Sequence, residues 1–580
     1  MKKSVIIIGS GMGGMAAGIY GQANGYETRI FEMHNVPGGQ CCSWKRKGYT
    51  FDGCIHHLFG CSPHSRINSL WREMGVMPRE LAPTQECASV LSPEGILFRD
   101  FWDLAELEEH LKELSPVDAV VIEDYVKGIK AFAKGDLWGD MMMGTVLELV
   151  KTLPRLLSTA KWLRPDMQRY AQRFSDPFLK KAFPLLEYSI PQIPVMLHLI
   201  NHAYGMQKDI EWPVGGSLEL AKSAERCYLN LGGEVHYKAR VKEILTAGGK
   251  AAGVKLEDGN EYHADLVISN ADGRKTIMDM LDGRYMDQHI REWCKDVDDE
   301  TPWAVDVFLG VDRDLTGEPS AMVMLLDEPY TIAGHSGDSL DIQIYGFDRT
   351  MAPEGKGVIK VELFSAYPYW KELAKDRDCY EEEKQKVADT VIDLLDAGYF
   401  SGIREQVEVV DVPTLLTWER YMGGTHGFQN TPNRKISVSG AVFGKGFATL
   451  PGLDSFYMVG GWATLANALF ANALSGRKAI KHICERDGKR FSPPRLMWLR
   501  SSGGHTVSGA AAIADLMFYQ TFWLLRQAKR RRANPSISGV RPNIDQICQA
   551  FQPFINRDYI VIDGLVIGKN NGAENPARSS

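Results

Sequence analysis

Cysteine and excess positive charge are both scarce in this sequence of 580 residues. The ten cysteines show no CxxC pair and no regular spacing, which argues against a zinc ribbon, a thioredoxin-type motif and a disulfide framework. The formal net charge is −7, whereas a protein that binds nucleic acid needs a positively charged surface for the phosphates. We therefore expect a cytoplasmic protein in a reducing compartment, without a nucleic acid partner.

Apolar sequence at the start of the chain is also short. The first apolar run ends at Gly9 after about four residues, too few for the core of a secretory signal peptide, and no cleavage pattern follows. The run, Val5–Ile8, is instead rich in β-branched residues, as is typical of a parallel strand buried on both faces.

A glycine-rich turn follows this expected strand and leads into an expected helix. The turn reads Gly-x-Gly-x-x-Gly, with Gly9, Gly11 and Gly14 in the defining positions and Gly13 beside the last. The first glycine permits a tight turn, the second lets the backbone approach a pyrophosphate, and the third permits close packing of helix and strand. The N-terminus of the helix then offers free N–H groups to the phosphates.

An acidic residue completes this motif. The next expected strand, 28–31, ends in Glu32, where a carboxylate accepts hydrogen bonds from ribose hydroxyls. The order of strand, glycines, helix, strand and acid predicts a dinucleotide-binding domain. The sequence has no second Gly-x-Gly-x-x-Gly, so NAD(P), if used as an electron donor or acceptor, is expected to bind only transiently.

The residues after the acid indicate FAD as the dinucleotide. They are Gly38, Gly39, Ser43 and Asp52. Their pattern resembles the second flavin signature of the glutathione-reductase-type FAD fold, in which a glycine pair and a downstream Gly-x-x-x-Asp flank the pyrophosphate. The sequence departs from that signature at Gln40, where arginine is common, and at Gly53, which follows the aspartate directly.

Two later blocks resemble the phytoene desaturase, carotenoid isomerase and retinol saturase family. Block 212–271 has a Pro-x-Gly-Gly helix start, a strand, an Asp-Gly hairpin and a strand ending in Asn-Ala, and block 453–477 has a strand followed by a helix. The resemblance implies a glutathione-reductase-type FAD-binding Rossmann fold of the α/β class. It also implies that the backbone of Val241 lies on the adenine, with Gly461 and Trp462 beside the flavin.

The same resemblance implies a discontinuous FAD-binding domain interrupted by a substrate domain. We assign residues 1–95, 211–275 and 421–485 to the FAD-binding domain, and 96–210 and 276–420 to an inserted mixed α+β substrate domain. Hydrophobic periodicity predicts helices at 104–114, 117–132, 146–163, 178–188, 193–204 and 381–395. Alternation predicts strands at 303–311, 322–326, 342–347 and 358–364.

The substrate itself is less well defined by the sequence. Apolar helices are more often plain core than a lipid tunnel, but the family resemblance implies an apolar isoprenoid or polyene-like substrate in a long tunnel. Residues 463–470 replace the Pro-Gly-Gly-Gly-x-Pro stretch usual in the family, where the chain should cover one face of the flavin. The identity of the substrate therefore stays open.

Segment 54–64 carries five potential metal ligands. They are Cys54, His56, His57, Cys61 and His64. A zinc or iron site is one interpretation, and ordinary core histidines are another. Because the segment follows the flavin strand where the chain should pass the ring, we favour His56 or His57 as a catalytic hydrogen-bond donor or proton relay, and no metal.

Cys41 and Cys42 follow the glycine pair, as cysteines do near the flavin of disulfide reductases. A redox disulfide beside a flavin needs two cysteines spaced to close a loop, and adjacent residues lack that spacing. We therefore expect no redox disulfide between these two.

The last hundred residues have no counterpart in the family and form a C-terminal extension, 486–580. Residues 507–525 are apolar and run into the basic stretch 526–532. Asp515 and Gln520 argue against a membrane span, so we expect either peripheral contact with an anionic membrane face or a helix docked on the body. The final residues, from 533, read as a polar tail.

The sequence as a whole predicts an FAD-dependent oxidoreductase that desaturates, saturates or isomerises carbon–carbon bonds. An FAD-dependent amine oxidase-like enzyme is the alternative, although no aromatic cage and no flavin-linking cysteine is visible in the last motif. A flavin-bound scaffold without turnover is a third class. The oligomeric state does not follow from the sequence.

Overall fold

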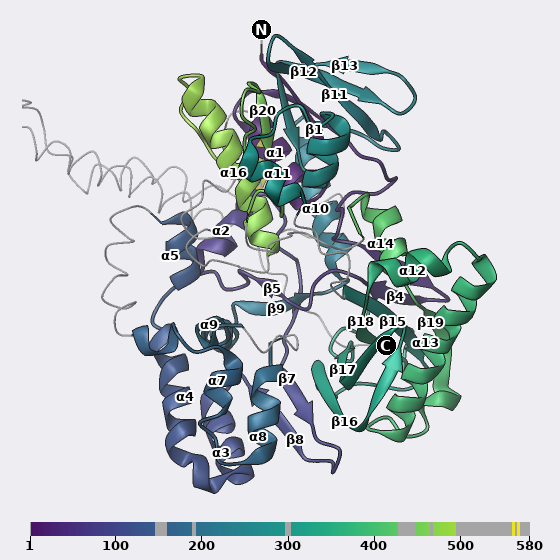
Figure 1. The fold of residues 1–580 in the computed structure, drawn as a ribbon. Coiled ribbons are helices and arrows are strands. Elements are labelled where there is room, and N and C mark those ends of the chain that lie inside the picture. The colour runs from purple at the N-terminus through teal and green to yellow at the C-terminus, as the bar shows by residue number, and fades with distance from the viewer. Residues whose placement is uncertain are drawn as a thin grey trace, which may run out of the picture. The chain divides into compact units, whose positions relative to one another are not determined.

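The computed structural model describes residues 2–144, 159–187, 193–295, 303–426, 448–464, 468–494, 559–562 and 565–568. The chain divides into two compact units, Met1–Leu496 and Met497–Ser580. In the second unit the described residues form one antiparallel pair, β21 (Tyr559–Ile562) and β22 (Leu565–Gly568). All other elements belong to the first unit (Figure 1).

A five-stranded parallel sheet forms the centre of the predicted dinucleotide-binding domain. Its strand order is β10-β2-β1-β14-β20. The strands are β1 (Ser4–Ile8), β2 (Glu27–Phe31), β10 (Glu234–His236), β14 (Leu266–Ser269) and β20 (Phe456–Met458). The sheet therefore joins segments from three distant parts of the chain, as expected for a discontinuous Rossmann fold.

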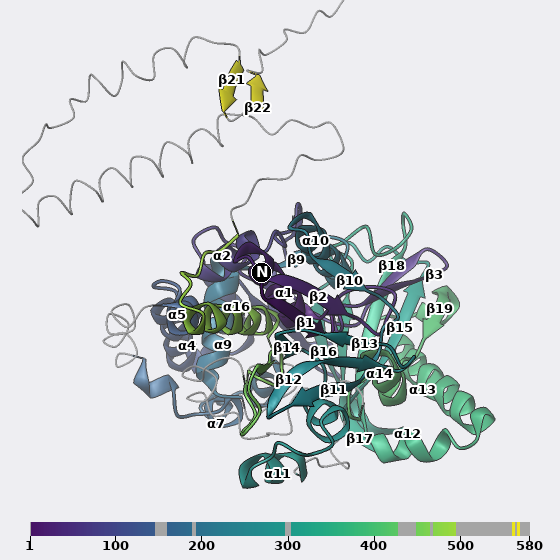
Figure 2. The ribbon, with the colours of Figure 1, turned by 90° about the horizontal axis from the view of Figure 1, so that it is seen from above.

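Three helices cover this sheet. They are α1 (Met12–Ala23), α10 (Ser217–Asn230) and α16 (Leu469–Arg486). Helix α1 packs against both α10 and α16, as Figure 2 shows from above. The approach of α16 is close because Gly476 lacks a side chain: a Cβ there would lie 2.3 Å from the carbonyl oxygen of Gly13.

A small antiparallel sheet, β11-β12-β13, extends from the same part of the fold. Its strands are β11 (Val241–Ala247), β12 (Lys250–Leu256) and β13 (Glu261–His263). The predicted Asp-Gly hairpin is confirmed, because Gly259 adopts a φ of +90° between two antiparallel strands. Helix α11 (Gln288–Lys295) lies near this sheet in Figure 2.

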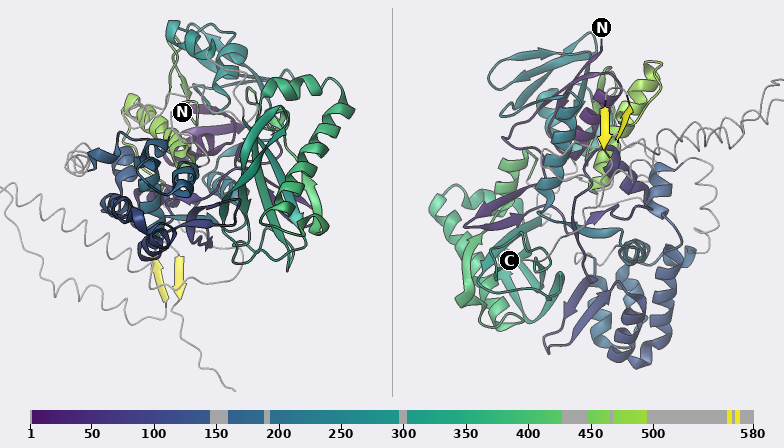
Figure 3. Two further views of the ribbon diagram at one scale, coloured as in Figure 1. Left: turned by 60° about the horizontal axis from the view of Figure 1, so that its bottom comes forward. Right: turned by 180° about the vertical axis from the view of Figure 1, so that it is seen from behind.

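A seven-stranded sheet with the order β19-β15-β18-β17-β16-β7-β8 forms the second core. Its strands are β7 (Glu86–Leu91), β8 (Leu97–Phe101), β15 (Trp303–Val311), β16 (Ala321–Ile332), β17 (His335–Ile344), β18 (Gly357–Ser365) and β19 (Val407–Asp411). The strands predicted at 303–311, 322–326 and 358–364 and the helix predicted at 381–395 are confirmed, whereas the strand predicted at 342–347 overlaps β17 only at 342–344. Helices α12 (Tyr367–Leu373), α13 (Arg377–Ala397) and α14 (Leu415–Met422) lie along it (Figure 3).

Apolar helices form the third group of elements. They are α3 (Leu104–Leu114), α4 (Ala119–Phe132), α5 (Leu137–Met143), α7 (Met167–Ala171), α8 (Pro177–Ala182) and α9 (Val195–Met206). They gather apart from the seven-stranded sheet, joined to it through β7 and β8 (Figure 1). Most of the helix predicted at 146–163 lies outside the described residues.

Short elements connect these three groups. They are α2 (Arg66–Glu73), the hairpin of β3 (Ser43–Arg46) and β4 (Tyr49–Asp52), and the strands β5 (Leu58–Phe59), β6 (Leu81–Ala82) and β9 (Ile210–Pro213). Among the described residues, no helix has the length and apolar character needed to cross a membrane. The predicted apolar helix 507–525 and the basic stretch 526–532 lie outside those residues.

Candidate functional site

A large cleft opens where the strands of the five-stranded sheet end. It has about 1590 Å³ of empty volume, counting its open mouth. All but two of the predicted cofactor-binding residues line it: Gly9, Gly11, Gly13, Glu32, Gly38, Gly39, Val241, Gly461 and Trp462. The structure therefore brings together residues that are up to about 450 positions apart in the sequence.

The glycine turn between β1 and α1 forms one wall of the cleft. Gly9 has a φ of +88°, and its N–H donates to the carbonyl of Phe31 at 2.8 Å. Gly14 does not line the cleft; a Cβ there would lie 2.1 Å from the carbonyl oxygen of Gly9, so this glycine serves the packing of α1. Gly38 closes the turn from the other side, through an N–H donated to Ser10 at 3.1 Å.

Asn270, at the end of β14, is a cleft residue that was absent from the predicted site. Its side-chain amide lies so close to the glycines that a Cβ on Gly11 would be 2.7 Å from Nδ2, and one on Gly13 would be 2.5 Å from Oδ1. Gly460, with φ at +85°, meets the same oxygen from β20. The Asn-Ala ending of the strand was visible in the sequence, but only the fold places that side chain against the glycine turn.

Glu32 is buried at the end of β2 and accepts hydrogen bonds from its own turn. Oε2 accepts from the backbone N–H and the hydroxyl of Ser10, at 2.8 and 2.6 Å, and Oε1 accepts from the N–H of His34 at 2.8 Å. These donors orient the carboxylate toward the cleft. The remaining lone pairs can accept further hydroxyl donors, such as those of a ribose.

Ser43 lies outside the cleft lining, together with Asp52. The Ser43 hydroxyl donates to Asp52 Oδ2 at 2.7 Å, and the same oxygen accepts from the N–H and the hydroxyl of Ser217 at 2.6 and 2.8 Å. Asp52 is fully buried at the N-terminus of α10, where a carboxylate is favoured by the helix dipole. In this structure these residues fasten the β3–β4 hairpin to α10.

The last strand brings the C-terminal motif to the cleft. The N–H of Gly460 donates to the hydroxyl of Ser475 on α16 at 2.7 Å, which fixes the end of β20 against that helix. Gly461 and Trp462 follow and line the cleft. Within the altered stretch 463–470, residues 465–467 lie outside the described part of the chain.

His56 and His57 line a second cavity, which has about 760 Å³ of empty volume when its open mouth is counted. One segment runs past both cavities: Cys54 and Ile55 line the cleft, and the next two residues line the second cavity. The second cavity lies between β7, β16, β17 and β18 and the end of the helical group. Its lining mixes apolar residues such as Met322 and Leu186 with carboxylates.

Burial sets the charge of these histidines. It lowers the pKa of His56 to about 4 and that of His57 to about 3, so both are neutral at neutral pH. His56 Nε2 lies 3.6 Å from Glu362 Oε2. Burial opposes ionisation of Glu362, but Lys360, 2.6 Å away, lowers its pKa to about 2. An ionised carboxylate therefore faces a neutral imidazole in this cavity.

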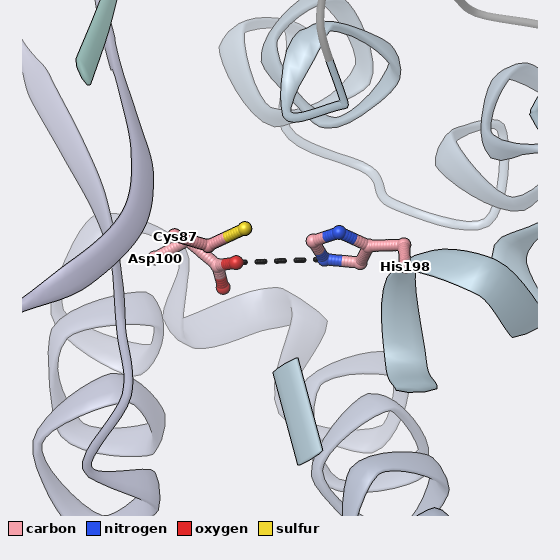
Figure 4. Close-up of side chains that lie close together, drawn as sticks. All are labelled: Cys87, Asp100 and His198. Atoms are coloured by element: carbon pink, nitrogen blue, oxygen red, sulfur yellow. Dashed lines mark ion pairs between the residues drawn. The ribbon is translucent and has the colours of Figure 1, made fainter. Parts of the chain in front are cut away.

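One group of possible metal ligands lies close together in the part of the chain that the structure describes. Cys87, Asp100 and His198 offer atoms within 4.8 Å of one another, and Figure 4 shows the carboxylate of Asp100 pointing toward the imidazole. His198 Nδ1 is 2.9 Å from Glu187 Oε1, and Nε2 is 2.5 Å from the Tyr125 hydroxyl. Protein groups thus contact both nitrogens, and no residue of 54–64 takes part.

The shape of the cleft suits a dinucleotide. Side chains at positions 11, 13 and 460 would collide with Asn270, so glycine there keeps an open backbone surface in front of the N-terminus of α1. A buried acid, Glu32, lines the cleft beside the glycine turn, and the described lining extends on to Trp462. This arrangement matches the needs of FAD: a pyrophosphate surface, a ribose acceptor and room for a ring system beyond.

Comparison with known proteins supports this assignment. Residues 7–74 match the family described as an NAD(P)-binding Rossmann-like domain. The chain is 26% identical over 524 residues to a chloroplastic prolycopene isomerase of Daucus carota, covering 85% of this chain and 81% of the relative. It is 25% identical over 448 residues to a lycopene-forming phytoene desaturase of Pantoea ananas, covering 73% and 88%.

Solved structures show the same fold. A redesigned putrescine oxidase superimposes with a TM-score of 0.54 at 12% identity, over 84% of this chain and 99% of the other. The predicted α/β class with a Rossmann core is confirmed, and so is the resemblance to phytoene desaturases and carotenoid isomerases. The prediction of an FAD-dependent oxidoreductase is confirmed by the similarity to the prolycopene isomerase and the phytoene desaturase.

Proposed function

We propose that this chain is an FAD-dependent oxidoreductase that desaturates, saturates or isomerises carbon–carbon double bonds in an apolar isoprenoid or polyene-like substrate. The observation that carries the proposal is that the segment 54–57 contributes residues to two cavities. One has the glycine surface and acid that FAD requires, and the other lies between the sheet and the apolar helices. Relatives named for carotenoid desaturation and isomerisation support the choice of substrate.

FAD, when bound, supplies the two-electron chemistry, and the protein supplies orientation and exclusion of water. Gly9, Gly11, Gly13, Gly38 and Gly39 present backbone to the pyrophosphate, and Glu32 accepts from the ribose. Val241, Gly461 and Trp462 complete the cleft. Gly14 acts through the packing of α1, and Ser43 acts through its hydrogen bond to Asp52, which fastens the β3–β4 hairpin to α10.

His56 and His57 take the role of hydrogen-bonding groups in the substrate cavity. Because both imidazoles are neutral at neutral pH, each can donate from one nitrogen and accept at the other. Two neutral imidazoles add no further charge to a cavity that already holds the ionised carboxylate of Glu362.

NAD(P), if it donates or accepts electrons, is proposed to bind only transiently, because the chain carries a single dinucleotide motif. A cytoplasmic location with peripheral contact at the membrane face would suit an apolar substrate that dissolves in lipid. The basic stretch 526–532 is the part of the sequence that favours such contact.

Product analysis tests the proposed reaction. FAD-loaded protein is incubated with linear polyenes of graded conjugation in detergent micelles, and the products are separated by chromatography and weighed by mass spectrometry. Desaturation removes two hydrogens, saturation adds two, and isomerisation leaves the mass unchanged while it moves the absorbance. The flavin-free variant Gly11→Val is the control. A loaded protein that alters no polyene, yet oxidises amines, would contradict the proposal in favour of the amine oxidase alternative.

A further inference from the structure

Two thiols lie against each other in the wall of the cleft. The Sγ atom of Cys54 lies 3.9 Å from the Sγ atom of Cys41, and both residues line the cleft. Both cysteines are free. Cys41 is buried and Cys54 is half-buried. Cys42, which directly follows Cys41, lacks the spacing for a redox disulfide with it, but Cys54 comes from a different part of the chain and lies beside Cys41.

The position of this pair follows from the β3–β4 hairpin. Ser43 is paired with Asp52 in the antiparallel register, and the N–H of Gly53 donates to the carbonyl of Cys42 at 3.1 Å. The residues just beyond the paired strands, Cys41 and Cys54, are thereby brought side by side. A disulfide needs its sulfur atoms about 2.05 Å apart, so thiols at 3.9 Å need to move about 2 Å toward each other to bond.

The two other cysteines near this pair, Cys42 and Cys61, are less well placed to form a disulfide with either thiol. Cys42 is buried and does not line the cleft. Cys61 donates its thiol hydrogen to the carbonyl of Leu58 at 3.2 Å. The geometry therefore selects Cys41 and Cys54.

We propose that Cys41 and Cys54 form a redox-active dithiol–disulfide pair that exchanges two electrons with FAD bound in the cleft, an inference that rests on the proposed flavin site. Oxidation breaks both S–H bonds, forms one S–S bond, releases two protons and passes two electrons to oxidised FAD. In the reverse direction reduced FAD returns two electrons, two protons are taken up, and the S–S bond is cleaved. The holoprotein thus stores a second pair of electrons next to its cofactor.

The surroundings of the pair favour the flavin over external oxidants as its redox partner. The hydrogen bond to Cys41, together with burial, raises the pKa of Cys54 well above its usual value, so this thiol keeps its proton at neutral pH. Dissolved disulfides and alkylating agents have to reach the pair through the cleft, where bound FAD would cover it. FAD in the same cleft needs no access from solvent.

The first experiment maps the bond in the unmodified full chain. Holoprotein is oxidised with ferricyanide, its remaining thiols are alkylated in denaturant, and the chain is cut with trypsin, which cleaves after Lys45, Arg46 and Lys47 between the two cysteines. We expect a cross-linked peptide pair joined through Cys41 and Cys54, seen by mass spectrometry and lost on reduction. Both residues recovered fully alkylated, or a bond from Cys42 instead, would overturn the proposal.

The second experiment counts electrons. The oxidised holoprotein is titrated anaerobically with dithionite while the flavin absorbance is followed. We expect about two equivalents of dithionite per FAD in the natural chain, and about one in Cys54→Ser and Cys41→Ala. Cys61→Ser is the matched control, since its residue lies on the same segment outside the pair, and it should still take two.

The outcomes separate the two proposals. A protein that takes up no FAD would overturn the proposed function and this inference together. A holoprotein that binds FAD and takes one equivalent in the natural chain would overturn the thiol pair alone. If Cys54→Ser or Cys41→Ala fails to fold, the mapping of the natural chain and the remaining variant still decide the question.

Discussion

The side-chain amide of Asn270 and the backbone of Gly11 are in close contact at the end of β14. A Cβ on Gly11 would lie 2.7 Å from Nδ2 of Asn270. The same amide borders Gly13 and Gly460, so one side chain holds the first glycine turn against the last strand of the sheet. Changes at this contact should therefore reduce cofactor binding before they unfold the chain.

Gly11→Val tests the pyrophosphate surface. The valine side chain would collide with Asn270 and project into the cleft, and we expect FAD affinity to fall by about 100-fold or more, which corresponds to about 2.7 kcal/mol. The ratio of flavin to protein after gel filtration measures this, with circular dichroism as a check on folding. Gly25→Asn, at a position with φ at +79° and open space around it, should keep its flavin. Full flavin content in Gly11→Val would show that the cleft is misassigned.

Asn270→Asp tests the charge requirement of the same contact. A carboxylate beside the N-terminus of α1 would repel a pyrophosphate, and we expect a loss of affinity of about tenfold or more. Titration of the flavin-free protein with FAD, followed by flavin fluorescence, gives the dissociation constant. The control Asn260→Asp adds the same charge in the exposed β12–β13 turn and should change nothing. Equal affinities in the two variants would argue against a phosphate at this place.

Glu32→Ala removes the proposed ribose acceptor. It also leaves the Ser10 and His34 donors without their carboxylate, so we expect FAD affinity to drop by about 10–100-fold and stability to fall by about 1–3 kcal/mol. Urea unfolding of the flavin-free protein separates the stability effect from the binding effect. Glu27→Ala, exposed at the start of the same strand, is the control. Unchanged FAD affinity in Glu32→Ala would place the ribose elsewhere.

Stability should fall as the solution becomes acidic, because the two cavity histidines resist protonation. Their folded pKa values, about 4 and about 3, lie below the ordinary 6.5, so only the unfolded chain gains these protons as the pH drops from about 6.5 toward 4. His57→Phe should flatten that decline in the unfolding midpoint. His64→Gln, exposed on the same segment, should retain it. An identical decline in His57→Phe would contradict the assigned burial effect.

Local patterns in the sequence were enough to predict most of the dinucleotide cleft. The glycine turn, Glu32 and the glycine pair each follow a strand, and parallel strands bring their carboxyl ends to one edge of a sheet. The strand predicted at 303–311 coincides with β15, an inner strand of its sheet in which every residue from Val305 to Val311 is buried.

Contacts between distant segments were not predictable in the same way. Ser43 and Asp52 match a flavin signature in sequence, yet Asp52 accepts hydrogen bonds from Ser217, 165 positions away, and Ser43 accepts one from the N–H of Leu218, 175 positions away. The pairing of Cys41 with Cys54 depends on the register of a hairpin whose strands are only four residues long. Asn270 acquires its place because β14 inserts between β1 and β20, which no local pattern specifies.

An anaerobic flavin assay with matched substrates tests the central claim most directly. Oxidised holoprotein is mixed with a partly saturated polyene or with a diamine, reduced holoprotein with a conjugated polyene, and the flavin absorbance near 450 nm is followed in each case. The proposed function predicts that a polyene changes the redox state of the flavin, or is isomerised while reduced flavin is present, and that the diamine does nothing. Bleaching by the diamine alone, with every polyene recovered unchanged, would contradict it.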